Sequence, residues 1–329
     1  MRVLPKVCVD MAVPKPLLSM PARFMIRGAG SIFAPVCAII AASRGTPGMQ
    51  VHRTVSNMAL RWLVKNRVPS IRRHLLNLVS NPIVLTRYQE FDFAWRHVPA
   101  KIDTYLDVSS PIVLPLKVIE KQVHIRATLL NPDKSDLATT EQLIDAGGLR
   151  ARCTTSDELI GSLAFKDSKF DLITCLSVLE HIPENKQAVQ KMWQLLRPGG
   201  TLIITVPCSA HAYELHTSSD HYGLLITDKR GYAFLEYLYD DQLLQDYLFS
   251  VTGIPDSIEI YGELKPGFLR KELLRRWGGN YTRFWAEPLL MGSEFRRFEK
   301  LADLPGEGVI CLSWVKHPAT FDESTVPPK

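Results

Sequence analysis

The chain has 329 residues, of which 46% are apolar, 22% charged and 9% aromatic, and its formal net charge at pH 7 is +5. This length and composition are those of an ordinary globular protein with one large core and room for a smaller appended unit. No apolar run reaches the roughly 20 residues that a membrane-spanning helix needs, and the longest, residues 31–42, contains Pro35.

Basic residues are concentrated in the first 90 positions. This segment holds 13 Lys/Arg but only the acids Asp10 and Glu90, a net charge of +11, whereas the rest of the chain carries −6. Such an imbalance predicts an anionic partner, either a phospholipid surface, a phosphorylated glycolipid or nucleic acid, unless the segment is simply a solvated arm. We expect peripheral contact with an anionic membrane, and we do not expect nucleic acid as a partner.

The cysteines favour a reducing compartment. The six cysteines are scattered without a CxxC pair, and Cys175 and Cys311 lie in apolar, strand-like runs where a free thiol behaves as a small hydrophobic group. This pattern is typical of a cytoplasmic protein rather than of a secreted one stapled by disulfides. We therefore expect a cytoplasmic protein that contacts a membrane, if at all, from its surface.

Residues 1–57 form the first of four predicted regions. Six prolines interrupt every candidate helix in it, so we expect an irregular and disordered basic leader. The leader superficially imitates a secretory signal, but about 30 residues before the apolar stretch are long for one. Translation that begins at Met49 or Met58 is a third reading, and the sequence does not separate the three.

Residues 58–90 are predicted to form basic amphipathic helices. Apolar residues recur there at helical spacing with arginines and lysines between them, and the pattern is interrupted at Pro69 and ends before Pro82. Such helices either pack on the following domain as a lid or lie on a membrane face. We favour the lid.

Residues 91–320 alternate between short apolar runs and helical patterns. This alternation predicts an α/β domain with a doubly wound, mostly parallel sheet, whose ligand lies beyond the carboxyl ends of the strands. An insertion is expected around 208–300 and a tail over 321–329. The predicted strands are Thr104–Val108, Val123–Leu130, Phe170–Leu176, Thr201–Val206, Ser257–Tyr261 and Val309–Val315.

The most informative stretch is Phe170–Pro207, FDLITCLSVLEHIPENKQAVQKMWQLLRPGGTLIITVP. A buried strand is followed by V-L-E-H, a helix, the helix-ending Pro198-Gly199-Gly200 turn and a second strand that ends in proline. The order and spacing resemble class I S-adenosylmethionine-dependent methyltransferases, particularly the type 11 group. The resemblance implies a seven-stranded Rossmann-like sheet, an antiparallel closing strand and S-adenosylmethionine as cofactor.

The resemblance also implies which residues surround the cofactor. In the family, the first strand ends in an acid and a glycine-rich turn; here Asp107 supplies the acid, and Ser109 and Ser110 stand where the glycines are expected. The second strand normally ends in an acid that binds the ribose. Here Asn131 and Asp133 are the nearest polar substitutes, although an ordinary turn explains Asn131-Pro132-Asp133 equally well.

Two more residues complete the implied cofactor set. Asp157 lies near the position at which the family contacts the adenine amino group, and a helix cap is the alternative explanation. Cys175 lies in the strand Phe170–Leu176, which the resemblance places beside the cofactor.

Methyl transfer needs alignment of acceptor and donor, and a hydroxyl or carbon acceptor also needs a general base. The candidates are His181, after the strand Phe170–Leu176, and His211, in the loop after the next strand. Packing beside the following helix is the structural alternative for His181. We expect no metal, because the spacing of His211, His216, Asp220 and His221 fits no common zinc pattern.

These observations predict an enzyme that transfers a methyl group from S-adenosylmethionine to a small-molecule, lipid or glycan acceptor. The missing glycines and ribose acid keep open a non-catalytic binding or scaffold protein of the same fold. A nicotinamide-dependent oxidoreductase is weakly supported, because no strand precedes a G-x-G-x-x-G motif. A membrane-binding or nucleic-acid-binding protein that acts through its basic leader is a further alternative, which salt-sensitive binding would favour.

Overall fold

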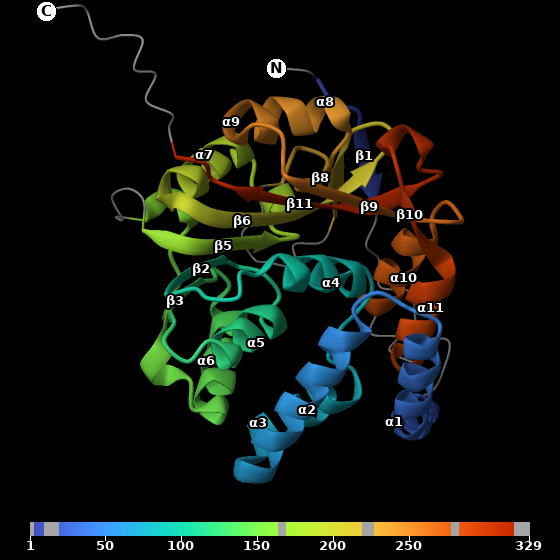
Figure 1. The fold of residues 1–329 in the computed structure, drawn as a ribbon. Coiled ribbons are helices and arrows are strands. Elements are labelled where there is room, and N and C mark those ends of the chain that lie inside the picture. The colour runs from blue at the N-terminus through green and yellow to red at the C-terminus, as the bar shows by residue number, and fades with distance from the viewer. Residues whose placement is uncertain (1–2, 10–19, 164–168, 219–226, 278–282, 319–329) are drawn as a thin grey trace, which may run out of the picture.

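The computed structural model describes residues 3–9, 20–163, 169–218, 227–277 and 283–318. Its main sheet has eight strands in the order β10-β9-β11-β6-β5-β2-β3-β4 (Figure 1). In that order they are β10 (Phe295–Phe298), β9 (Ser257–Glu263), β11 (Glu307–Val315), β6 (Leu196–Ser209), β5 (Phe170–Leu176), β2 (Thr104–Val108), β3 (Arg126–Leu130) and β4 (Cys153–Ser156).

The strand directions confirm the predicted doubly wound sheet. Strands β4, β3, β2, β5 and β6 pair in parallel, and β11 runs antiparallel between β6 and β9. Seven strands were expected, and β10, which pairs antiparallel with β9, is an eighth. We call the side of the sheet at which β2, β3, β5 and β6 end the carboxyl edge, because ligands of such sheets bind there.

Helices cover both faces of the sheet (Figure 1). One face carries α4 (Arg87–His97), α5 (Val113–Lys121) and α6 (Lys134–Gly147). The other carries α7 (Asn185–Leu195) and a continuous helical segment made of α8 (Asp241–Leu244), a π-helical turn over Gln245–Phe249 and α9 (Ser250–Thr252). Each face has its own hydrophobic core, as the layered architecture requires.

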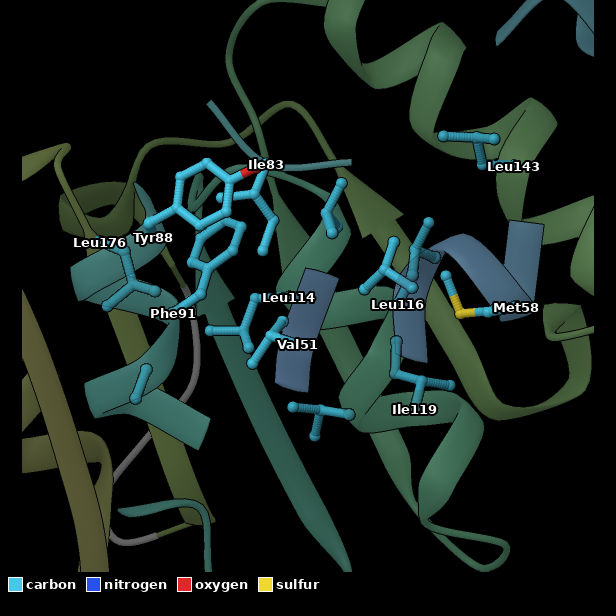
Figure 2. Packing of buried hydrophobic residues seen from close by; sticks show 14 of the residues in the cluster. Val51, Met58, Ile83, Tyr88, Phe91, Leu114, Leu116, Ile119, Leu143 and Leu176 are labelled. Carbon is cyan, nitrogen blue, oxygen red and sulfur yellow. The ribbon is translucent and has the colours of Figure 1, made fainter. Parts of the chain in front are cut away.

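The first core joins the N-terminal helices to the sheet. Figure 2 shows Val51 and Met58 packed near Leu114, Leu116 and Ile119 of α5. Val51 and Met58 belong to α2 (Met49–Lys65), which buries eight residues and packs against α4, α5 and α6. Burying each large apolar side chain contributes about 1.5–3 kcal/mol, so this contact alone holds α2 on the domain. Helix α2 therefore packs on the domain, and its role as a lid stays a prediction.

The prediction of an irregular leader over 1–57 is wrong for its second half. Helix α1 (Met20–Ser43) continues through Pro35, and α2 starts at Met49. The interior proline costs one backbone hydrogen bond, but tertiary packing compensates. At Gly30 a Cβ would lie 2.1 Å from the Trp285 ring, so α1 and the segment before α11 (Glu287–Glu294) are in close contact.

Helix α3 (Pro69–Ser80) agrees with the predicted interruption at Pro69 and the end before Pro82. Among the described residues, no helix is long and apolar enough to cross a bilayer.

A second, three-stranded sheet lies against the carboxyl edge. It consists of β1 (Lys6–Val9), β7 (Tyr213–Thr217) and β8 (Ala233–Leu238), with β1 parallel and β8 antiparallel to β7. The segment just after β8 continues along the end of β6, where the Ser209 N–H donates to the Tyr239 carbonyl at 3.0 Å. Part of the predicted insertion around 208–300 therefore forms a wall at the end of β6. The remainder includes β9 and α10 (Phe268–Trp277).

Candidate active site at the carboxyl edge

Asp107 lies at the end of β2 and organises the turn that follows. Its side chain is 3% exposed, and its carboxylate accepts hydrogen bonds from Thr174 Oγ1 at 2.5 Å and from the Ser110 backbone N–H at 3.0 Å. Burial raises the pKa of Asp107 to about 7, although these hydrogen bonds oppose the rise. Asp107, the acid that the resemblance implied, thus stabilises the turn after β2 through a buried hydrogen bond to its backbone.

Ser109, the first of the two serines that follow, adopts the left-handed backbone geometry expected of glycine. Ser109 has φ 54°, and its N–H donates to the Leu130 carbonyl at 2.9 Å, while Ser110 Oγ accepts from the Leu176 N–H at 3.0 Å. Ser177, just beyond β5, is also left-handed, with φ 48°. Strained backbone of this kind persists where surrounding structure enforces it and is concentrated at functional sites. Two neighbouring strand ends carry it here.

Asn131 and Asp133 lie after β3, on the same edge. Asp133 Oδ1 accepts from the backbone N–H groups of Ser135 and Asp136 at 2.8 and 3.1 Å, which makes Asp133 the N-cap of α6. Asn131 Oδ1 accepts from the Asp133 N–H at 3.0 Å. Both side chains therefore form hydrogen bonds within the turn after β3, as the alternative explanation of Asn131-Pro132-Asp133 predicted. A ribose-binding role for them stays a proposal.

The other two cofactor candidates differ sharply in exposure. The Asp157 side chain is 58% exposed and lies 3.9 Å from the Lys134 ammonium group, so it is a surface residue of the β4 end. Cys175 is fully buried in β5, and burial raises the pKa of its thiol well above the usual value. The thiol is therefore protonated, and its contribution is packing beside the carboxyl edge.

Sequence reasoning missed Glu90, which α4 brings to the ends of β5 and β6. Its side chain is completely buried and pairs with Arg87 at 2.6 Å. Its carboxylate also accepts hydrogen bonds from Ser177 Oγ at 2.8 Å and from Thr205 Oγ1 at 2.7 Å. The available signal was that Glu90 is the only acid between Asp10 and Asp92.

The candidate base His181 lies in a short 3-10 turn after β5 and faces the added sheet. Its Nδ1 lies 2.7 Å from the Leu235 carbonyl of β8, and because a carbonyl only accepts, Nδ1 carries a proton. In the neutral ring Nε2 then holds the lone pair, and it lies 3.9 Å from Glu180 Oε1. This arrangement fixes the ring and gives Nε2 the capacity to take a proton.

Glu180 and Glu236 complete a polar cluster around His181. Glu180 is 2% exposed, and its Oε2 has no hydrogen-bond partner among the described residues. Burial and the nearby Glu236 carboxylate raise the pKa of Glu180 well above its usual value. Ligand atoms of Glu180, His181 and Glu236 lie within 4.8 Å of one another, so these three residues could hold a metal ion.

His211, the second candidate base, lies in the loop after β6 and is exposed. On β7, His216 Nε2 lies 2.9 Å from Glu214 Oε2. Asp220 and His221 lie outside the described residues. The structure thus brings His181 into the polar cluster at the carboxyl edge and leaves His211 at the surface.

Two motif residues of the stretch Phe170–Pro207 serve the opposite end of the sheet. Asp171 accepts from the backbone N–H groups of Asp103 and Thr104 at 2.7 and 2.8 Å and pairs with Arg197. These contacts join the starts of β2, β5 and β6. They explain the motif spacing through strand alignment rather than through ligand binding.

The strand order, the left-handed turn after β2 and the polar side chains at the carboxyl edge define a doubly wound domain of the methyltransferase type. Residues 106–204 match a family model described as a methyltransferase domain. Over these residues the chain is similar to methyltransferase domains, which supports the resemblance to class I S-adenosylmethionine-dependent methyltransferases.

Curated relatives share this central part. The chain is 30% identical over 92 residues to the ubiquinone biosynthesis O-methyltransferase of Haemophilus ducreyi, and 33% identical over 98 residues to that of Glaesserella parasuis. The alignments cover 28% and 30% of this chain and 39% and 37% of those proteins, so the chain spans less than half of their length. A solved geranyl diphosphate methyltransferase, in complex with GPP and sinefungin, is 10% identical with a TM-score of 0.45, over 69% of this chain and 78% of that one.

Proposed function

We propose that the protein transfers a methyl group from S-adenosylmethionine to a small-molecule acceptor at the carboxyl edge. The observation that carries the proposal is the family match over residues 106–204, which spans the turn after β2, the end of β5 and most of β6. The cofactor supplies an activated methyl group when bound. The chain's task is to hold the acceptor in line with that group and to remove a proton where the acceptor is a hydroxyl.

The residues at the carboxyl edge fit such a cofactor. The left-handed conformation of Ser109 allows a tight backbone turn after β2, and Asp107 stabilises this turn by accepting a hydrogen bond from the Ser110 N–H. Asn131 and Asp133 present polar atoms at the end of the neighbouring strand, the position from which family members bind the ribose. Asp157 would contribute to adenine recognition at the end of β4, and Cys175 would pack beneath the cofactor.

We assign the role of general base to His181. Its Nδ1–H donates to the Leu235 carbonyl, so Nε2 is the atom that accepts the proton. His211 is the second candidate for this role, because the loop after β6 borders the acceptor region in the family.

A lipid or glycan acceptor, with peripheral contact to an anionic membrane, is the finer form of the proposal. Two observations support it. No acid occurs between Asp10 and Glu90, although nine basic residues lie in α1, α2, α3 and their connections. In addition, Ile32, Phe33, Val36 and Ile39 form an exposed apolar face on α1.

The second candidate function is a non-catalytic binding or scaffold protein of the same fold. One observation favours it: Asp133, the nearest substitute for the ribose acid, already caps α6. The two functions differ in whether S-adenosylhomocysteine is formed.

The test is product formation from S-adenosylmethionine carrying a labelled methyl group, with a panel of phenols, catechols, prenylated phenols and glycolipids. Transfer to one acceptor class, with kcat reduced about 100-fold in His181→Gln and little changed in His211→Gln, supports the assignment. Transfer to none of the acceptors, by protein that still binds the cofactor, supports the scaffold reading.

A further inference from the structure

A cavity of about 290 Å³ lies between three helices on the face of the sheet covered by α4 and α5. Helix α5 leads from the carboxyl end of β2 back toward the start of β3, so its last turn lies at the edge opposite the proposed methyl-transfer site. We call this space the α2–α5 cavity. Its lining residues are Thr54, Asn57 and Arg61 of α2, Trp95 of α4, and Lys117, Glu120 and Lys121 of α5.

Lys117 is an unusual residue to find in this wall. Its side chain is only 7% exposed, and its Nζ donates to Thr54 Oγ1 at 2.7 Å and lies 3.7 Å from the centre of the Trp95 ring. Lys121 places a second ammonium group 4.6 Å from the centre of the same ring. A hydroxyl and one shared aromatic face offset only part of the cost of desolvating an ammonium group.

The charges around the cavity do not balance. Glu120 is the single carboxylate in the lining, and it is bonded to Arg61 at 2.6 Å. Three cationic side chains against one acid leave a net charge of +2 on the cavity wall. Burial lowers the pKa of Lys117 to about 8, which is the expected response of an ammonium group that lacks a bonded anion.

We propose that the α2–α5 cavity binds a phosphate monoester, with Lys117, Lys121 and Arg61 as its cationic contacts. A phosphate monoester carries a charge of about −1.5 to −2 near neutral pH and three acceptor oxygens, which matches the net charge and the number of cations. The side-chain amide of Asn57 supplies a further hydrogen-bond donor. The phosphate belongs either to a lipid headgroup or to a soluble metabolite, and the proposal is independent of methyl transfer.

The test is calorimetric titration of the full chain with inorganic phosphate at constant ionic strength. We expect saturable one-site binding that Lys117→Met weakens about tenfold or more, because a charge-assisted contact is lost. Lys121→Ala, at an exposed position that keeps the fold intact, is expected to weaken binding in the same direction. Arg53→Gln is the matched control, since it removes an exposed charge from α2 outside the cavity, and it should leave the affinity unchanged.

Vesicles of phosphatidylcholine with and without phosphatidate identify the source of the phosphate. Sedimentation with phosphatidate vesicles that Lys117→Met abolishes and inorganic phosphate competes away assigns the site to a lipid headgroup. Phosphate binding that depends on Lys117, together with vesicle binding that does not, assigns it to a soluble phosphate ester. Absence of saturable phosphate binding, or equal affinities in Lys117→Met and Arg53→Gln, overturns the proposal.

Discussion

The buried carboxyl group of Asp107 should make stability depend on pH in a direction unusual for an aspartate. Its pKa rises from 3.8 to about 7 on folding because burial disfavours the charged form. Between these values the unfolded chain has lost the proton while the folded chain keeps it, so the free energy of unfolding falls as pH rises. A shift of about three units corresponds to about 4 kcal/mol, fully lost once the pH exceeds 7.

Replacing Asp107 with Asn removes this titration and preserves most of the contacts. The Asn carbonyl can accept from the Ser110 N–H, and its amide can donate to the hydroxyls of Thr174 and Tyr105. We therefore expect Asp107→Asn to lose less stability than the wild type between about pH 4.5 and pH 7.5, by about 3 kcal/mol.

Urea denaturation across this pH range measures the difference. Asp145→Asn is the control, because Asp145 is exposed and Arg150 lowers its pKa rather than raising it. Parallel pH profiles for wild type and Asp107→Asn would refute the reasoning, since they would mean that Asp107 is already ionised in the folded protein at low pH.

Two further predictions concern the buried Glu90 and the helix cap Asp133. Glu90→Gln should lower the free energy of unfolding by about 3 kcal/mol, because Arg87 loses its buried partner, and the double variant with Arg87→Met should recover part of it in urea denaturation. Asp133→Ala should cost about 1 kcal/mol through the lost cap of α6, whereas Asp133→Asn should be nearly neutral in thermal denaturation. Equal losses for the two Asp133 variants would contradict the capping role.

The central strands could be predicted closely from the sequence. Thr104–Val108 and Phe170–Leu176 have the predicted bounds, because parallel strands buried on both faces read as continuous apolar runs. Local patterns of this kind need no knowledge of distant residues. The prediction that Pro198-Gly199-Gly200 ends the preceding helix is wrong, because α7 ends at Leu195 and these three residues lie within β6, where Gly199 has φ 79°.

The parts that could not be predicted depend on contacts between distant segments. Glu90 accepts hydrogen bonds from Ser177 and Thr205, which lie far along the chain, and no local sequence pattern predicts such contacts. Helix α1 survives Pro35 because it packs near Trp285, which the helix-breaking rule for proline ignores. The roles of His181 and of the cofactor residues remain predictions, since geometry alone locates them without assigning their chemistry.

Titration of the purified chain with S-adenosylmethionine and S-adenosylhomocysteine tests the central claim most directly. We predict one-site binding of both ligands, with a dissociation constant of about 1 μM to 100 μM, weakened by Asp107→Ala, which removes the acceptor that holds the turn after β2, and unchanged by Asp145→Asn. Absence of heat with either ligand, from protein that unfolds cooperatively, would contradict a cofactor site at the carboxyl edge and leave the scaffold function in its place.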